Sequence, residues 1–234
     1  MKVTAIVPAA GAGRRFGANK PFVLLRGKPL FLWALTALEE APEISEIIPV
    51  FKDSDMGAGR ELIERHSLSK VKRIAGGGPE RQDSVANALK LISPETDIVL
   101  IHDGGRPLIE TALISMAIAA LADGPWGDGV ITAVPPKDTV KEAAPDGVVL
   151  MTLDRRALWS VQTPQVFRRD IILRAYERAS SEGFYSTDDS ALVERYGGRV
   201  SILMGSYRNI KVTTPEDIAI AEVFLRESRG LSCG

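Results

Sequence analysis

The chain has 234 residues, of which 45% are hydrophobic and 25% are charged, and its formal net charge at pH 7 is −1. This composition is typical of a globular protein, and no apolar run approaches the roughly 20 residues of a membrane span. The near-zero net charge argues against nucleic acid or a membrane surface as the partner. The single cysteine, Cys233, has no partner for an internal disulfide, so we expect a reducing, cytoplasmic environment.

Short runs of apolar and β-branched residues alternate along the chain with longer segments of helical period. The expected strands are Val3–Val7, Ile47–Phe51, Val71–Ile74, Ile98–Ile101 and Val130–Val134. The expected helices are Pro29–Glu40, Gly59–His66, a segment with Val85, Ala88, Leu89 and Ile92 on one face, and Glu110–Leu121. The strands are apolar throughout, which predicts an α/β fold: a Rossmann-like, mostly parallel sheet with helices on both faces. Such sheets bind ligands beyond the carboxyl ends of their strands.

This alternation breaks near residue 135. A polar, proline-bounded stretch ends in Val148–Thr152 and contains Pro145-Asp146-Gly147, which predicts a hairpin with a tight turn. We expect residues 135–157 to form a projecting β-arm that contacts a partner subunit, within one domain spanning residues 1–230. Beyond the arm, the expected elements are helices Arg169–Ser180, Asp188–Tyr196 and Pro215–Ser228 and strands Val200–Met204 and Asn209–Val212.

A glycine-rich loop follows the first strand directly and reads Pro8-Ala9-Ala10-Gly11-Ala12-Gly13-Arg14-Arg15-Phe16-Gly17. Small residues with exposed N–H groups favour anion binding. The loop matches neither the dinucleotide fingerprint, for which Gly17 comes one residue late, nor the P-loop, which needs Gly-Lys-Ser/Thr. Its cations Arg14 and Arg15, with Lys20 nearby, suit a triphosphate whose leaving pyrophosphate must be neutralised. A tight turn with solvated arginines is the alternative interpretation.

Together with later motifs, this loop resembles the nucleotidyltransferases related to 2-C-methyl-D-erythritol 4-phosphate cytidylyltransferase. The later motifs follow the family's order and are Gly77–Val85, His102–Pro107, Lys137–Lys141, Leu153–Arg155, Gln162–Gln165, Thr187–Asp189 and Asn209–Thr213. The resemblance implies the nucleotidyltransferase fold. It also implies attack of a sugar-alcohol phosphate on the α-phosphorus of CTP, which releases pyrophosphate and gives a CDP-alcohol for non-mevalonate isoprenoid synthesis.

The same resemblance assigns roles to individual positions. The catalytic cations it implies are Arg15, Lys20 and Lys211. The implied nucleotide-binding residues are Ala9, Ala10, Gly11, Gly13, Arg14, Gly78, Arg81 and Ser84. The implied acceptor-binding residues are Arg106, Arg155, Thr163 and Thr187. In the family, the arginine of the Asp-Arg step lies on the arm and enters the neighbouring subunit's site, which implies a homodimer with Arg155 acting across the interface.

Asp103 follows the buried strand Ile98–Ile101, at the edge of the sheet where ligands bind. Because Mg²⁺ prefers carboxylate and phosphate oxygens, we expect a Mg²⁺ site at Asp103. The alternative is that Asp103 only caps the next turn.

Three alternatives to the leading function stay open at this point. A ribitol 5-phosphate cytidylyltransferase would share most of the motifs. An NAD-dependent oxidoreductase is disfavoured by the position of Gly17 and by the acidic residue Asp53, which follows the loop by about 40 residues rather than about 20. A binding protein that has lost catalysis is disfavoured because the charged positions of the motifs are all present.

Overall fold

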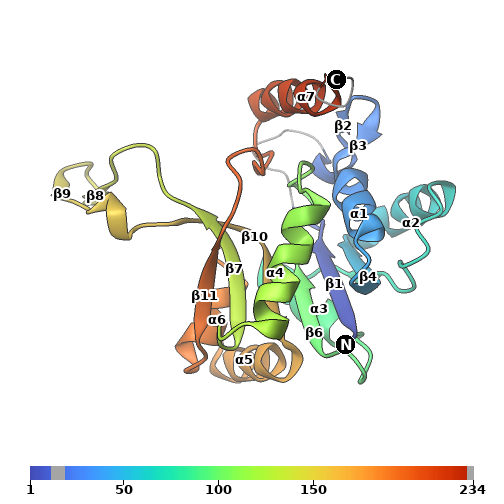
Figure 1. The fold of residues 1–234 in the computed structure, drawn as a ribbon, viewed down its shortest axis with the longest axis horizontal. Coiled ribbons are helices and arrows are strands. Elements are labelled where there is room, and N and C mark those ends of the chain that lie inside the picture. The colour runs from blue at the N-terminus through green and yellow to red at the C-terminus, as the bar shows by residue number, and fades with distance from the viewer. Residues whose placement is uncertain (12–18, 231–234) are drawn as a thin grey trace.

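The computed structural model describes residues 1–11 and 19–230, and a seven-stranded sheet forms its centre (Figure 1). In the order β11-β7-β10-β6-β1-β4-β5, every strand except β10 runs in the same direction. The strands are β1 (Val3–Pro8), β4 (Ile44–Phe51), β5 (Ala75–Gly76), β6 (Ile98–Ile101), β7 (Gly129–Val134), β10 (Ser160–Arg168) and β11 (Val200–Met204). The mostly parallel α/β sheet is therefore confirmed.

Helices cover both faces of this sheet, because residues on the two sides of each central strand are apolar. On one face, Val3, Ala5 and Val7 pack with helices α1, α2 and α4. On the other face, Ile6 packs with helices α3, α5 and α6. The helices are α1 (Leu30–Glu40), α2 (Met56–Arg65), α3 (Arg81–Leu89), α4 (Thr111–Asp123), α5 (Arg169–Glu182), α6 (Asp189–Arg195) and α7 (Pro215–Gly230). None of the helices in the described ranges has the length and apolar character needed to cross a bilayer.

The chain leaves the sheet after β7 and forms an arm that stands clear of the other elements (Figure 1). The arm carries the antiparallel hairpin of β8 (Lys141–Ala143) and β9 (Val149–Thr152), followed by the short helix η3 (Arg155–Ala157). The predicted turn is present, and Gly147 has φ +88°, a left-handed conformation that favours glycine. The chain then returns as β10, between β7 and β6 and antiparallel to both. The sequence pattern did not predict β10, because Gln162, Thr163, Pro164 and Gln165 interrupt its apolar run.

Two predicted strands were wrong. In the segment Val71–Ile74, only Val71 forms a bridge, with Ile47, and the short strand β5 comes later, at Ala75–Gly76. The segment Asn209–Val212 forms no strand either. Its polar groups make individual contacts instead, since the Val212 N–H donates to the carbonyl of Gly105 and the Asn209 amide donates to the carbonyl of Thr163. These contacts hold the segment across the carboxyl edge of the sheet.

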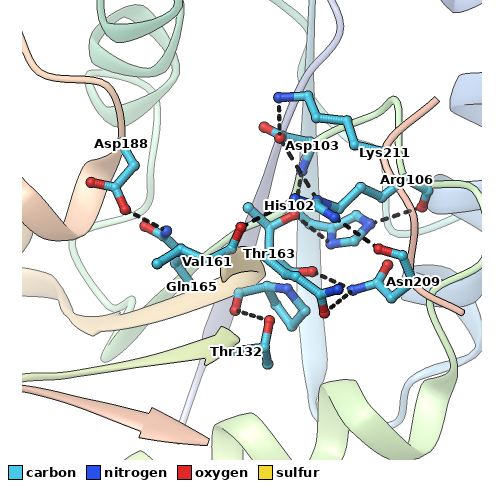
Figure 2. Close-up of polar contacts among 12 residues, drawn as sticks. His102, Asp103, Arg106, Thr132, Val161, Thr163, Gln165, Asp188, Asn209 and Lys211 are labelled. Carbon is cyan, nitrogen blue, oxygen red and sulfur yellow. Dashed lines mark hydrogen bonds and ion pairs between the residues drawn. The ribbon is translucent and has the colours of Figure 1, made fainter. Parts of the chain in front are cut away.

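A short series of hydrogen bonds joins the end of β6 to the start of β10 (Figure 2). The register that pairs Gln165 with Ile101 places Thr163 beside the residues that follow β6. The Thr163 hydroxyl accepts from the Asp103 N–H at 3.0 Å and lies 3.1 Å from Nδ1 of His102. Nε2 of His102 lies 3.1 Å from the carbonyl oxygen of Arg106, which can only accept. Nε2 therefore carries the proton and Nδ1 accepts from Thr163.

This arrangement needs a neutral imidazole, and His102 is fully buried. Burial lowers the pKa of the His102 imidazole from 6.5 to about 4. Between these two values the unfolded chain binds a proton that the folded chain does not bind. The contribution of His102 to stability is therefore complete above the unfolded pKa and decreases as the pH falls through this window.

We predict that His102→Gln removes part of the acid sensitivity of folding. As the pH falls from 6.5 towards 4, the wild type should lose up to about 3 kcal/mol of unfolding free energy that the variant does not lose, because the shift of the imidazole pKa is absent from the variant. Urea unfolding across this pH range measures the difference. His66→Gln removes the other histidine, which lies on the surface, and serves as the control. Equal pH dependence in wild type and His102→Gln would contradict the prediction.

Candidate active site

A cavity of about 750 Å³ opens beyond the carboxyl ends of β1, β4, β5 and β6. This is the position at which open α/β sheets bind ligands. Residues from widely separated parts of the chain, between positions 8 and 213, line the cavity. The predicted site residues among them are Ala9, Ala10, Gly11, Lys20, Gly78, Arg81, Ser84, Asp103 and Lys211.

Small residues bring two backbone segments close together on one wall of the cavity. The Ala9 N–H donates to the carbonyl of Val50, which continues the contact between β1 and β4. A Cβ atom on Gly77 would lie 2.5 Å from Cβ of Ala10, so no larger residue fits there. The Gly78 N–H donates to the hydroxyl of Ser84 at 3.0 Å, and that hydroxyl donates to the carbonyl of Glu80. The predicted nucleotide-binding positions therefore form a tightly packed backbone surface.

Three predicted residues of the glycine-rich loop, Gly13, Arg14 and Arg15, lie outside the described residues. Their expected roles as nucleotide-binding and catalytic groups stay predictions. Lys20 comes directly after this loop, in the short helix η1 (Lys20–Phe22), and is described. Its ammonium lies 2.9 Å from the position that a Cβ atom on Gly105 would occupy. The absence of a side chain at Gly105 therefore makes room for the Lys20 ammonium in the lining of the cavity.

Asp103 lies at the centre of a group of cations. Its Oδ2 is 2.7 Å from Nζ of Lys211 and 4.0 Å from Nε of Arg106, and its Oδ1 accepts from Nε of Arg81 at 3.1 Å. Burial by itself raises the pKa of the Asp103 carboxyl, but Arg81, Lys211 and Arg106 outweigh it and hold the pKa well below its usual range. Asp103 is therefore ionised, and the three surrounding cations exceed its charge.

Arg106 is buried below the cavity rather than on its surface. One of its terminal nitrogens donates to the carbonyl of Asn209 at 2.8 Å, and the other lies 3.4 Å from the carbonyl of Val161 (Figure 2). Its Nε is buried and has no hydrogen-bond partner among the described residues. Desolvation lowers the pKa of the Arg106 guanidinium, although Asp103 acts in the opposite direction. Arg106 thus connects Asp103 to the segment that carries Lys211.

The remaining predicted acceptor-binding residues do not line this cavity. Thr163 is buried, and its hydroxyl is used by Asp103 and His102. Thr187 is exposed, just before the Asp188 side chain that caps α6. Arg155 is exposed on the arm, where it donates to the carbonyl of Lys137 at 2.8 Å. Among the predicted acceptor-binding residues, Arg106 and Thr163 therefore reach the site only through Asp103, and Thr187 and Arg155 do not line the cavity of their own chain.

Sequence reasoning missed two residues that contact the site through Arg81. Asp189 receives both terminal nitrogens of Arg81, at 3.0 and 2.7 Å, and the Tyr176 hydroxyl donates to Asp189 at 2.5 Å. The sequence pattern placed Asp188 and Asp189 only at the start of a helix. The available signal was the second carboxylate of Thr187-Asp188-Asp189, since Asp188 alone provides the helix cap. Lys52, which also lines the cavity, was missed as well.

The family model and the similar proteins of known sequence all indicate the same family. Residues 3–227 match the family described as 2-C-methyl-D-erythritol 4-phosphate cytidylyltransferase. The chain is 47% identical to the protein of that name from Geotalea uraniireducens, with 97% of both chains covered. It is 46% identical to the one from Syntrophus aciditrophicus, with 98% of both chains covered.

Solved structures agree with this result. The 4-diphosphocytidyl-2C-methyl-D-erythritol synthase of Anaerococcus prevotii superposes with a TM-score of 0.84 at 33% identity, and 96% of both chains is covered. The 2-C-methyl-D-erythritol 4-phosphate cytidylyltransferase of Thermus thermophilus superposes with a TM-score of 0.75 at 27% identity, covering 94% of this chain and 98% of the other. Sequence identity, full-length coverage and fold all agree, and the chain belongs to the 2-C-methyl-D-erythritol 4-phosphate cytidylyltransferase family.

Proposed function

We propose that the chain joins CTP to 2-C-methyl-D-erythritol 4-phosphate, giving the CDP-alcohol and pyrophosphate in the non-mevalonate isoprenoid pathway. Membership of the family over nearly the whole chain supports this function. The structural observation that carries it is the convergence of Lys20, Lys211 and Arg81 on one cavity around Asp103. Both substrates are anionic phosphates, so a site for their reaction must first hold them together against repulsion.

The reaction needs charge stabilisation rather than a general base. An oxygen of the acceptor phosphate, already ionised at neutral pH, forms a bond to the α-phosphorus of CTP. The bond from that phosphorus to the bridging oxygen breaks, and pyrophosphate leaves with the electron pair. The Lys20 ammonium lies beside Gly105, and that of Lys211 contacts Asp103. Both lysines line the cavity, where their ammonium groups can neutralise the triphosphate as charge develops.

A divalent cation fits the donor chemistry of this site. Asp103 supplies one ionised carboxylate, and Mg²⁺ is commonly held by one or two carboxylates together with substrate phosphates. Within residues 1–11 and 19–230 no group of three His, Cys, Asp or Glu side chains is placed to hold a metal by itself. We therefore propose that Asp103 and the phosphates of CTP hold Mg²⁺ jointly. When bound, the ion would supply Lewis-acid stabilisation of the phosphate charge.

We propose further that the protein acts as a homodimer in which the arm of one subunit completes the acceptor site of the other. Four consecutive apolar residues on the arm, Val148 to Met151, are 52–61% exposed. An exposed apolar patch of this kind is typical of a protein interface. Arg155 lies on the same arm, at the start of η3, and is not among the described residues that line the cavity of its own chain. A partner's arm would bring such an arginine to the acceptor phosphate.

The first prediction concerns substrates. With Mg²⁺ present, CTP and 2-C-methyl-D-erythritol 4-phosphate should release pyrophosphate and form the CDP-alcohol. ATP, GTP and UTP in place of CTP, and ribitol 5-phosphate in place of the acceptor, should react far more slowly. A coupled pyrophosphate assay with mass detection of the product measures this. Product formed preferentially from ribitol 5-phosphate would show that the acceptor is wrong.

The second prediction concerns Lys20. Lys20→Ala should lower kcat by about 100-fold or more, because a charge that stabilises the departing pyrophosphate is lost. The unfolding transition should change little, since the side chain borders an open cavity. Lys90→Ala, an exposed lysine at the end of α3, is the matched control and should keep wild-type kinetics. Wild-type turnover by Lys20→Ala would remove this residue from the mechanism.

The third prediction tests the arm. Lys20→Ala and Arg155→Ala subunits should each be inactive alone, but mixed and reassociated dimers should regain about a quarter of wild-type activity. Half of the dimers are then mixed, and each mixed dimer has one site with both residues intact. If the arm acts within its own chain, no mixed site is intact and no activity returns. Size-exclusion chromatography with light scattering confirms that reassociation has occurred.

A further inference from the structure

A row of buried polar contacts runs from the interior of α5 to the cavity. Tyr176 in α5 donates its hydroxyl to Asp189 in α6 at 2.5 Å. Asp189 in turn receives two N–H groups of Arg81, the first residue of α3. The third nitrogen of Arg81, Nε, donates to Oδ1 of Asp103 at 3.1 Å. The row therefore links three helices to the carboxylate that follows β6.

The inner part of this row is buried and fully hydrogen-bonded. Asp189 is 1% exposed and Tyr176 is 6% exposed, so the Asp189 carboxylate cannot be solvated by water. A buried carboxylate is stable only when it is paired and hydrogen-bonded. The two parallel N–H groups of Arg81 and the Tyr176 hydroxyl meet this requirement. Asp189 also lies in the first turn of α6, where the helix dipole favours a negative charge.

The two oxygens of Asp103 are consequently unequal. Oδ1 is held by Arg81, whose planar guanidinium is fixed on its other edge by Asp189. Oδ2 is contacted by the ammonium of Lys211, a point charge on a flexible stem whose side chain is 41% exposed. Lys211 can move away while the buried pair of Arg81 and Asp189 stays intact, and the Nε of Arg106, 4.0 Å from Oδ2, then remains as a nearby charge. Oδ2 is therefore the exchangeable oxygen.

We propose that Tyr176 and Asp189 are positioning residues that act through Arg81. They hold Asp103 by Oδ1 and leave Oδ2 free to bind the divalent metal ion that also meets the phosphates of CTP. This inference rests on the proposed function. The cavity lining within the described residues includes Arg81 and Asp103 but neither Tyr176 nor Asp189, so neither of the two residues is itself catalytic. Arg81 is thus assigned to support of the carboxylate, in addition to its predicted place beside the nucleotide.

The direct test is binding of Mn²⁺ in the presence of CTP and without acceptor, followed by electron paramagnetic resonance. Asp189→Asn keeps the shape of the side chain but removes the charge that orients Arg81. We expect the Mn²⁺ dissociation constant to rise about 10-fold, the usual effect of losing a partner that orients a metal ligand. In the assay, kcat should fall by a similar factor, while KM for the acceptor should change less.

Tyr176→Phe removes only the hydroxyl and should shift the Mn²⁺ constant in the same direction by a smaller factor. The matched control is Tyr196→Phe, because the Tyr196 hydroxyl also bonds a carboxylate, that of Glu182, away from the cavity. This control should leave both Mn²⁺ binding and kcat unchanged. If Asp189→Asn does not fold, Tyr176→Phe decides the question, and wild-type Mn²⁺ binding by Tyr176→Phe would then overturn the proposal.

A double-mutant comparison separates positioning from general structural support. If Asp189 acts through Asp103, then adding Asp189→Asn to Asp103→Asn should cause no further loss of Mn²⁺ binding. Equal losses in both backgrounds would overturn the proposal, as would unchanged Mn²⁺ binding by a folded Asp189→Asn single variant. The binding measurement also stands apart from the reaction. If the wild type forms no CDP-alcohol but Asp189→Asn and Tyr176→Phe weaken Mn²⁺ binding as described, the proposed function fails while the positioning role holds.

Discussion

Asp103 places one negative charge among three cations that reach it from different parts of the chain. Arg81 comes from α3, Arg106 from the turn after β6, and Lys211 from the segment after β11, all within 4.0 Å of its oxygens. Without a carboxylate between them, these cations would repel one another in a partly desolvated site. The carboxylate therefore holds the cationic groups together while leaving an excess of positive charge, which in the proposed reaction would meet the phosphates of CTP.

The return of the chain through β10 connects this site to the arm. Because β10 runs antiparallel, it begins at the carboxyl edge of the sheet, so Thr163 lies beside Asp103 and His102. The same excursion that separates β7 from β10 carries the arm away from the body (Figure 1). One change of strand direction thus serves two purposes. It brings the Thr163 hydroxyl to the backbone N–H of Asp103, and in the proposed dimer it presents Arg155 and an apolar surface to a second subunit.

The net charge of −1 does not describe the charge distribution that the fold produces. It argues against a polyanionic partner, but it is an average over the whole chain. Lys20, Arg81 and Lys211 line one cavity in which Asp103 is ionised, so the local balance is positive. Small anionic substrates respond to this local charge rather than to the total. Composition therefore argues only against nucleic acid as a partner, and it could not reveal this cationic cavity.

Local sequence patterns were enough to predict features that depend on neighbouring residues, namely the alternation of buried strands and helices and the turn at Gly147. The ordered motifs of the sequence also indicated the family. Three further features depend on how distant parts of the chain pack: β10 lies antiparallel within the sheet, Asn209–Val212 is not a strand, and Arg81 pairs with Asp189, 108 residues away. Hydrophobic periodicity indicates which face of a helix or strand is buried. The partner of a buried polar group depends instead on how elements that are distant in sequence pack together.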